Sequence, residues 1–220
     1  GDTVQGTPLA YVAARLRTHE PHPVVAAMNA LGYDAMVVGN HEFNLGLETL
    51  WRLKAEAQFP WLAANLSSYY HDSHRRFPSY VIREVGGVRV AVLGLVTSAV
   101  PRWEVAEHHR GYRFHDLVET ARRYVPKLRR RADVVLILAH AGLGRDPETG
   151  KPQPRAPDEH VVWDIAEQVP GIDAVIFGHS HSELSGLRVN DALLVQPKYW
   201  AQSVAELRIT VQRDTPQQPW

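Results

Sequence analysis

Residues 34–42 carry the sequence DAMVVGNHE, in which a short apolar run ends in Gly39-Asn40-His41-Glu42. A helical pattern follows from Leu45 to Ala57. Apolar runs between helical patterns are typical of buried strands in α/β proteins, and open α/β sheets hold their sites beyond the carboxyl ends of such strands. The stretch therefore predicts a functional site at Asn40 and His41.

Two later apolar runs end in the same manner. Val134–Ala139 ends in His140, and Ala174–Phe177 ends in Gly178-His179-Ser180-His181. Three predicted strands are thus each followed by histidine, and this is the central observation in the sequence.

Length and composition bound the class of protein. The 220 residues suffice for one sizeable domain with a buried core, and 45% hydrophobic and 22% charged residues are ordinary for a globular protein. A net charge of zero favours neither a nucleic-acid polymer nor a membrane surface as partner. The chain has no cysteine, so His, Asp, Glu and Asn are left to bind any metal, which suits borderline or hard divalent ions.

The two ends of the chain indicate a piece of a longer protein. The sequence begins Gly-Asp without an initiator Met, in loop-like sequence, and no apolar run is long enough for a membrane span. The polar, proline-containing tail over 214–220 resembles a linker, so we expect one domain over 1–213.

Local signals predict several elements. Thr7-Pro8 starts a helix, a second helix runs from Pro23 to Leu31, and strands 79–85 and 88–95 form a hairpin around Gly86-Gly87. Asp116 caps a helix that should kink or end early at Pro126. The remaining predictions are a surface loop over 66–78, irregular structure over 97–113, a long loop over 141–157, a helix over 158–169, and antiparallel strands over 186–195 and 203–211.

The order of these elements indicates a fold class. Helix and strand alternate early, whereas hairpins dominate later. This mixture predicts an α/β domain in which two packed mixed sheets are flanked by helices, that is, a four-layer αββα sandwich.

The candidate site residues share a place at strand ends or in the loops that enter them. They are Asp2, Asn40, His41, His140, His179 and His181. Neutral imidazole and carboxylate are good ligands for first-row divalent metals, and a carboxylate such as that of Asp2 can bridge two ions. Two such ions form the clamp that stabilises the attacking and leaving oxygens in phosphoryl transfer.

Other features receive a simpler interpretation. Eight further histidines are interpreted as surface or core residues: His19, His22, His71, His74, His108, His109, His115 and His160. The basic run over 127–131 is interpreted as a solvated helix end, favoured by the helix dipole, and nucleic-acid binding there is the weaker alternative. Gly142-Leu143-Gly144 is only a weak phosphate-binding signal.

Four motifs together resemble the calcineurin-like metallophosphoesterase superfamily, and within it the 5′-nucleotidase family. They are GDTVQGTPL (1–9), GNHEFNLGL (39–47), the histidine of ILAHAGLG (137–144) and GHSH (178–181). The stretches GLVTSAVPRWE (94–104) and IAEQVPGIDAVIFGHSHSE (165–183) resemble its 2′,3′-cyclic-nucleotide 2′-phosphodiesterase/3′-nucleotidase branch.

The resemblance implies a role for each matching residue. Asp2 would bridge two metal ions, whereas Asn40, His140 and His179 would complete one site and His181 would belong to the other. His41 would be the catalytic histidine. The ions would be Mn, Zn, Fe or Co, since nitrogen and oxygen ligands admit all four.

The sequence departs from the family pattern in what it lacks and at Asn44. An Asp-x-His motif expected on a first strand before Asp2 is absent, so the first metal would keep only Asp2 and His181 and bind poorly. A C-terminal substrate-binding domain is also absent. Asn44 stands where the 5′-nucleotidases often have Asp; it can orient His41 by a hydrogen bond but carries no charge, and it favours the cyclic-nucleotide branch.

The implied reaction is hydrolysis of a 2′,3′-cyclic nucleotide to the 3′-nucleotide and then to the nucleoside. A metal-activated hydroxide would attack, and His41 would assist the leaving group. A 5′-nucleotidase or nucleotide-sugar hydrolase is the alternative within the family, and a non-catalytic metal- or nucleotide-binding module is the alternative outside it. We expect a monomer that acts on small nucleotides and, by the resemblance, a periplasmic, cell-wall or secreted location.

Overall fold

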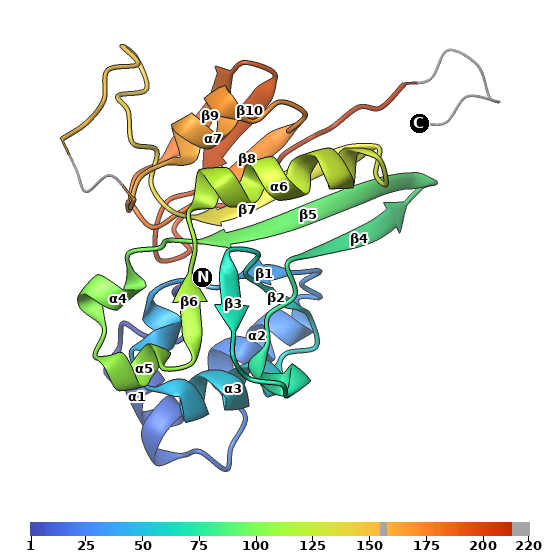
Figure 1. Ribbon diagram of the computed structural model, residues 1–220. Helices are drawn as coiled ribbons and strands as arrows, with labels where there is room; N and C mark the ends of the chain where they lie inside the picture. Colours follow the sequence, from blue (N-terminus) through green and yellow to red (C-terminus); the bar gives the residue numbers. More distant parts are fainter. Residues whose placement is uncertain (155–157, 213–220) are drawn as a thin grey trace.

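The protein is described from a computed structural model, which covers residues 1–154 and 158–212 (Figure 1). A six-stranded mixed sheet dominates it, with the strand order β4-β5-β7-β8-β10-β9. The strands are β4 (Tyr80–Val85), β5 (Val88–Val96), β7 (Val134–His140), β8 (Ala174–Phe177), β9 (Leu184–Val189) and β10 (Ala192–Gln196). The four central strands run parallel, whereas the edge strands β4 and β9 are antiparallel to their neighbours.

Two smaller strand pairs stand in place of the predicted second sheet in the described chain. β1 (Met36–Val37) pairs in parallel with β2 (Trp61–Leu62), and β3 (Leu66–Ser68) pairs antiparallel with β6 (Tyr112–Phe114). These pairs lie between the large sheet and a group of helices (Figure 1). The α/β class and the layered arrangement predicted from the sequence are therefore confirmed.

Helices form the outer layers (Figure 1). On one side lie α6 (Leu117–Arg129) and α7 (Val162–Gln168), and on the other lie α2 (Pro23–Ala30) and α3 (Leu47–Glu56). The shorter helical segments are α1 (Pro8–Tyr11), a π-helical turn (Val12–Leu16), α4 (Val100–Trp103), α5 (Ala106–His109), and 3-10 turns at His41–Phe43 and Ser73–Arg75. None of the helices in the described ranges is long and apolar enough to cross a membrane.

Two hydrophobic cores hold these layers together. The first lies between the large sheet and helices α6 and α7, where alternate residues of β5, such as Leu93 and Leu95, share one cluster with Leu117 and Val125. The second is built around Trp61 and the residues of α2 and α3 that pack near it. Each fully buried side chain of this size contributes roughly 1.5–3 kcal/mol.

Gly94 on β5 allows the small strands to approach the large sheet. A Cβ at this position would lie 2.3 Å from the Leu62 Cβ and 2.8 Å from its backbone carbon. The backbone N–H of Ala64 donates to the Gly94 carbonyl at 2.7 Å. The two layers are therefore joined by backbone contact where β2 crosses β5.

Local turn and cap signals are confirmed. The Thr7 side chain accepts from the Ala10 N–H at 3.1 Å, and the Asp116 side chain accepts from the Glu119 N–H at 2.7 Å. The β4–β5 hairpin turns at Gly86 and Gly87, whose φ angles of 59° and 84° favour glycine.

The early end expected at Pro126 is wrong, because α6 continues to Arg129. Pro126 lies on the exposed face, where water can reach the carbonyl that loses its helical partner. The opposite face buries Leu117, Val125 and Leu128, so packing outweighs the local cost.

The prediction of single strands over 186–195 and 203–211 is also wrong. The first segment is a tight hairpin, β9–β10, in which Val189 pairs with Ala192 across Asn190-Asp191. Asn190 has a φ of 51°, which its short polar side chain tolerates. Residues 203–211 form no strand and pair with neither β9 nor β10.

Three other segments differ from their predictions. The expected loop over 66–78 contains β3, and the irregular stretch over 97–113 contains α4, α5 and β6. The helix expected over 158–169 begins only at Val162. The loop over 141–157 is confirmed for 141–154, and residues 155–157 lie outside the described ranges, as do 213–220 with the predicted linker.

Candidate active site

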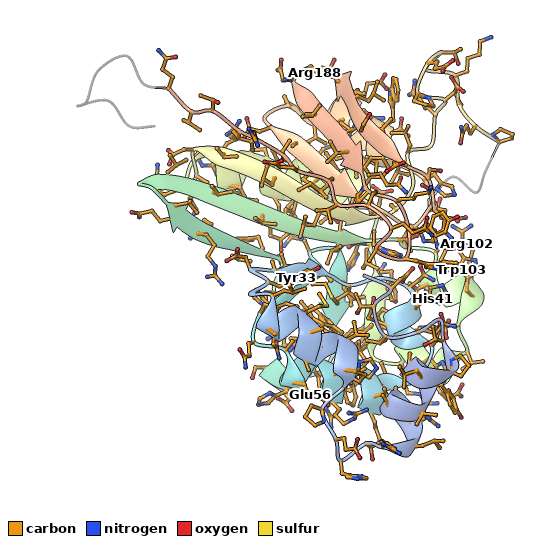
Figure 2. The ribbon with its side chains drawn as sticks, turned by 180° about the vertical axis from the view of Figure 1, so that it is seen from behind. Tyr33, His41, Glu56, Arg102, Trp103 and Arg188 are labelled. Atoms are coloured by element: carbon orange, nitrogen blue, oxygen red, sulfur yellow. The ribbon has the colours of Figure 1, made fainter. Side chains whose placement is uncertain are left out.

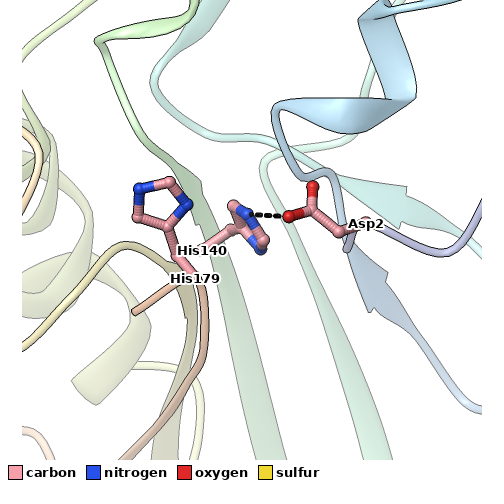
Figure 3. Close-up of side chains that lie close together, drawn as sticks. All are labelled: Asp2, His140 and His179. Carbon is pink, nitrogen blue, oxygen red and sulfur yellow. Dashed lines mark ion pairs between the residues drawn. The ribbon is translucent and has the colours of Figure 1, made fainter. Parts of the chain in front are cut away.

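The site forms where carboxyl ends of parallel strands meet. His140 is the last residue of β7 and pairs in register with Val96, the last residue of β5. His179 follows β8 by two residues, and Asn40 follows β1 by three. Figure 3 shows the His140 ring between the Asp2 carboxylate and His179. The sequence prediction that strand ends bring histidines to one place is confirmed for His140 and His179, with His41 beside them.

His140 is the centre of this cluster. Its Nε2 atom lies 3.0 Å from Asp2 Oδ2 and 3.0 Å from Asn40 Oδ1. The His140 side chain is only 4% exposed. Three potential ligand atoms, one from each residue, therefore converge on one point between the two cores.

His179 completes the cluster from the other side. Potential ligand atoms of Asp2, His140 and His179 all lie within 4.8 Å of one another. The His179 Nε2 atom lies 3.1 Å from Glu159 Oε1, while Nδ1 is buried without a hydrogen-bond partner among the residues that the structure describes. A buried imidazole nitrogen without a partner is costly, unless a ligand occupies the place that it faces.

Burial and neighbouring charge set the protonation states. Burial alone would raise the pKa of Asp2, but the hydrogen bond and charge of His140, with the His41 N–H, hold that pKa well below its ordinary value. Burial lowers the pKa of His179 to about 4, and nearby His140 acts in the same direction, against the opposing Glu159. At neutral pH the cluster therefore combines a carboxylate with a neutral imidazole, the forms that bind metal.

Glu42 fixes the segment that carries Asp2. Its buried carboxylate accepts the backbone N–H groups of Asp2 at 2.8 Å, Thr3 at 2.6 Å and Gly39 at 2.6 Å. The Asp2 side chain in turn accepts the His41 N–H at 2.9 Å. The glutamate of GNHE thus joins residues 2–3 to the loop after β1.

Backbone strain gathers at the same place. Asp2, His179 and His181 have φ angles of 62°, 77° and 52°. Left-handed backbone is uncommon for residues other than glycine and persists where the surroundings impose it, often at functional sites. Three of the five predicted metal ligands share this conformation.

His41 lies at the open side of the cluster and is 38% exposed. Its Nε2 atom is 4.0 Å from Asp2 Oδ2, and its Nδ1 atom is 2.5 Å from Asn44 Oδ1. Since a carbonyl oxygen can only accept, Nδ1 carries the hydrogen and Nε2 faces the site. The predicted contact between His41 and Asn44 is therefore present.

His181 lies apart from the cluster. Its side chain is exposed and its ring stacks on Tyr199, with centroids 5.2 Å apart. It does not belong to the group of potential metal ligands found in the described ranges. Its assignment to a second metal site remains a prediction.

The donor set fits a divalent metal ion. Two ligand atoms each about 2.1 Å from one ion lie roughly 3.0–3.4 Å apart at ordinary bond angles, and the 3.0 Å separations at His140 match this spacing. The Nδ1 atom of His179, which has no partner among the described residues, is an independent observation that fits a ligand at this place. Glu159 on Nε2 fixes the tautomer in which Nδ1 keeps its lone pair, as carboxylates behind metal-bound histidines do.

Sequence reasoning missed several residues of this site. Glu159 and His160 precede α7, and the His160 Nε2 atom lies 3.2 Å from Glu159 Oε1. Trp103 stacks on the His179 ring with centroids 5.5 Å apart. Trp103, Arg102 and His41 lie on the same side of the molecule (Figure 2). No spacing signal marks these residues, because they come from segments without periodicity.

The fold and this cluster define the class of protein. The chain belongs to the calcineurin-like phosphoesterase family, whose pattern matches residues 1–183.

Individual relatives show which members of this family the chain resembles. The chain is 36% identical over 198 residues to a 2′,3′-cyclic-nucleotide 2′-phosphodiesterase/3′-nucleotidase of Salmonella typhimurium, covering 84% of this chain and 29% of that one. A protein assigned as a 5′-nucleotidase from Staphylococcus aureus, solved with α-ketoglutarate, superposes with a TM-score of 0.80 at 31% identity, over 90% of this chain and 38% of that one. The calcineurin-like phosphoesterase YfkN of Bacillus subtilis gives 0.77 at 31% identity, over 91% and 66%. The chain thus spans less than a third of the Salmonella relative.

Proposed function

We propose that this chain is the catalytic domain of a metal-dependent phosphoesterase that hydrolyses nucleotides, most specifically 2′,3′-cyclic nucleotides to 3′-nucleotides and then nucleosides. One observation carries the proposal: Asp2, Asn40 and His140 converge within 3.0 Å contacts, beside an imidazole nitrogen of His179 that has no partner. Membership of the phosphoesterase family supports the reaction class.

Asp2, Asn40, His140 and His179 would hold one divalent ion, and Asp2 with His181 would contribute to a second. Ions bound there supply Lewis-acid polarisation of the phosphoryl group and activate water as nucleophile near neutral pH. Glu42 keeps Asp2 in place through three backbone N–H bonds, and Glu159 keeps His179 oriented. Mn, Zn, Fe and Co are all compatible with this donor set.

His41 would act on the leaving group. Its Nδ1–H is committed to Asn44, so Nε2 is the nitrogen that faces the reacting phosphate. There Nε2 would first take up a proton, which gives the imidazolium, and then donate that proton to the departing oxygen, a contribution typically worth 10²–10⁴-fold in rate. A non-catalytic binding module would have no need for an oriented imidazole beside the metal ligands.

A depression beside Asn44 offers space for the rest of a nucleotide. It has a volume of about 520 Å³ and is lined by residues of the loop over 4–8 together with Tyr11, Asn44 and Leu45. Half-exposed Tyr11 offers an aromatic face there. A depression of this volume falls within the range of ordinary ligand sites.

The relatives favour the cyclic-nucleotide substrate, and a 5′-nucleotidase is the alternative that the Staphylococcus aureus structure supports. Our proposal includes a domain over 1–213, followed by a substrate-binding domain in the full-length protein. It also includes action as a monomer on small nucleotides rather than nucleic-acid polymers, and a periplasmic, cell-wall or secreted location.

The test uses the full-length protein, stripped of metal by a chelator and reloaded with Mn²⁺ or Zn²⁺. We expect turnover of 2′,3′-cyclic AMP to vanish on stripping and return on loading, with 3′-AMP as second substrate and slower turnover of 5′-AMP. Faster turnover of 5′-AMP would select the 5′-nucleotidase alternative. Metal-independent turnover would refute the proposal.

A further inference from the structure

Behind His41 lies a chain of side chains that the proposed function does not use. The Asn44 Nδ2 group donates to Glu104 Oε1, and Glu104 Oε2 accepts from His108 Nδ1 at 3.0 Å. Asn44 ends the 3-10 turn that begins at His41, Glu104 directly follows α4, and His108 lies in α5. Four side chains from three segments are therefore linked in one line.

The amide of Asn44 has two chemically different ends of similar shape. If the oxygen faces His41 Nδ1, that nitrogen must carry the hydrogen; if the NH₂ group faces it, the hydrogen must move to Nε2. Asn44 alone does not select between these two arrangements. Something on its far side has to.

Glu104 makes that selection. A carboxylate only accepts hydrogen bonds, so it pairs with the NH₂ end of Asn44 and turns the oxygen toward His41. The Glu104 side chain is only 10% exposed, and the ion pair with His108 holds its second oxygen. The carboxylate therefore cannot swing away into solvent without breaking both contacts.

We propose that Glu104 is a positioning residue which, through Asn44, holds His41 in the tautomer with hydrogen on Nδ1 and Nε2 facing the reacting phosphate. This inference deepens the proposed function and rests on it for its kinetic consequence. The sequence indicated that neutral Asn44 gives His41 no carboxylate partner. In the structure the carboxylate of Glu104 contacts Asn44, which in turn contacts His41.

The first test reads the tautomer directly and needs no activity. In the full-length protein loaded with Zn²⁺ and labelled with ¹⁵N, the His41 ring signals are assigned by their loss in His41→Gln. We expect the Nδ1–H form in the wild type. Glu104→Ala should show the Nε2–H form or a mixture. An unchanged Nδ1–H form in Glu104→Ala would overturn the proposal.

The second test is a double-mutant cycle in turnover of 2′,3′-cyclic AMP. Glu104→Ala should lower kcat about tenfold with little change in KM, and Glu104→Ala in an Asn44→Ala background should have no further effect. Glu107→Ala is the matched control, because Glu107 is in α5 with an exposed ion pair to Arg110.

Equal losses of kcat from Glu104→Ala in both backgrounds would show that Glu104 does not act through Asn44. Thermal unfolding of each variant separates a positioning effect from a loss of fold. If the wild type hydrolyses no phosphoester, the proposed function fails, while the ring signals still decide whether Glu104 sets the His41 tautomer.

Discussion

Asp2 and His179 each present two polar atoms to different surroundings in this site. Asp2 contacts His140 with one oxygen and the His41 backbone with the other. His179 presents one nitrogen to Glu159 and leaves the other buried and unpaired. His179 is thus held on one side by Glu159, and its other nitrogen has no hydrogen-bond partner among the described residues.

Replacement of Glu159 tests this arrangement. Glu159→Ala removes the acceptor on His179 Nε2, so the ring can rotate or adopt the other tautomer. We expect metal affinity to fall 10–100-fold, as for other carboxylates behind metal-bound histidines. Isothermal titration of the stripped protein with Zn²⁺ measures this fall directly.

Glu119→Ala is the control for that measurement, since Glu119 makes an exposed ion pair with Arg122 on α6. Unchanged Zn²⁺ affinity in Glu159→Ala would remove Glu159 from the site.

Among single residues, the sequence pointed to the candidate metal ligands but not to the residues that hold them. His140 and His179 follow apolar runs and Asn40 stands in a recognisable motif, so local pattern exposes them. Glu104 and Glu159 lie in irregular segments 60 or more residues from Asn44 and from His41. Only tertiary contact brings these two glutamates to the site, and no periodicity reports such contact.

Among the elements, β2 and β5 approach each other closely at Gly94. Gly94 lets Leu62 pass at a distance that no Cβ permits. Gly94→Ala must therefore push the small strands away from the large sheet, and we expect a loss of about 1–3 kcal/mol in unfolding free energy. Urea denaturation measures it.

Gly178→Ala is the matched control for stability, because a Cβ there would meet nothing within 4 Å. Equal stability of Gly94→Ala and wild type would show that the two layers are not in backbone contact.

The start of β7 is tied to β5 by an ion pair that responds to pH. Arg89 contacts Asp133 at 2.9 Å, and this hydrogen bond holds the pKa of Asp133 below its ordinary value of 3.8. The folded state therefore binds the proton less readily than the unfolded state. The stabilisation is present above pH 3.8 and is lost as the pH falls through the lowered pKa.

Asp133→Asn should accordingly lower the melting temperature at pH 6, and the difference from the wild type should shrink as the pH falls below 3.8 toward the lowered pKa. Differential scanning fluorimetry across this range tests it. A difference between the two proteins that stays constant with pH would contradict the assigned pKa shift.

Element boundaries followed from sequence where caps and turns are strong. Thr7, Asp116 and Gly86-Gly87 marked theirs correctly. One failure lies where tertiary packing overrides a local signal, because α6 passes Pro126 while its other face is buried. Residues 203–211 are predicted as a strand but pair with no strand of the described chain. Strands β3 and β6 are three residues long and pair across 46 positions, which no local pattern reveals.

In the whole molecule the two hydrophobic cores meet at the site. The large sheet supplies His140 and leads into His179, whereas the small strands and the loop over 39–44 supply Asn40, His41 and Asn44. The candidate metal ligands therefore lie on segments that pack into both cores, and relative movement of the layers would separate these residues. The Gly94–Leu62 contact and the Glu42 hydrogen bonds to residues 2, 3 and 39 would limit such movement.

We propose that His41 assists the leaving group beside a metal centre that other residues build. The most direct test measures turnover of 2′,3′-cyclic AMP and metal content together in the full-length protein, for wild type, His41→Ala and His140→Ala. We predict that His41→Ala loses 10²–10⁴-fold in kcat with metal content retained, whereas His140→Ala loses metal as well. Full turnover in His41→Ala, or unchanged metal content in His140→Ala, would contradict the account.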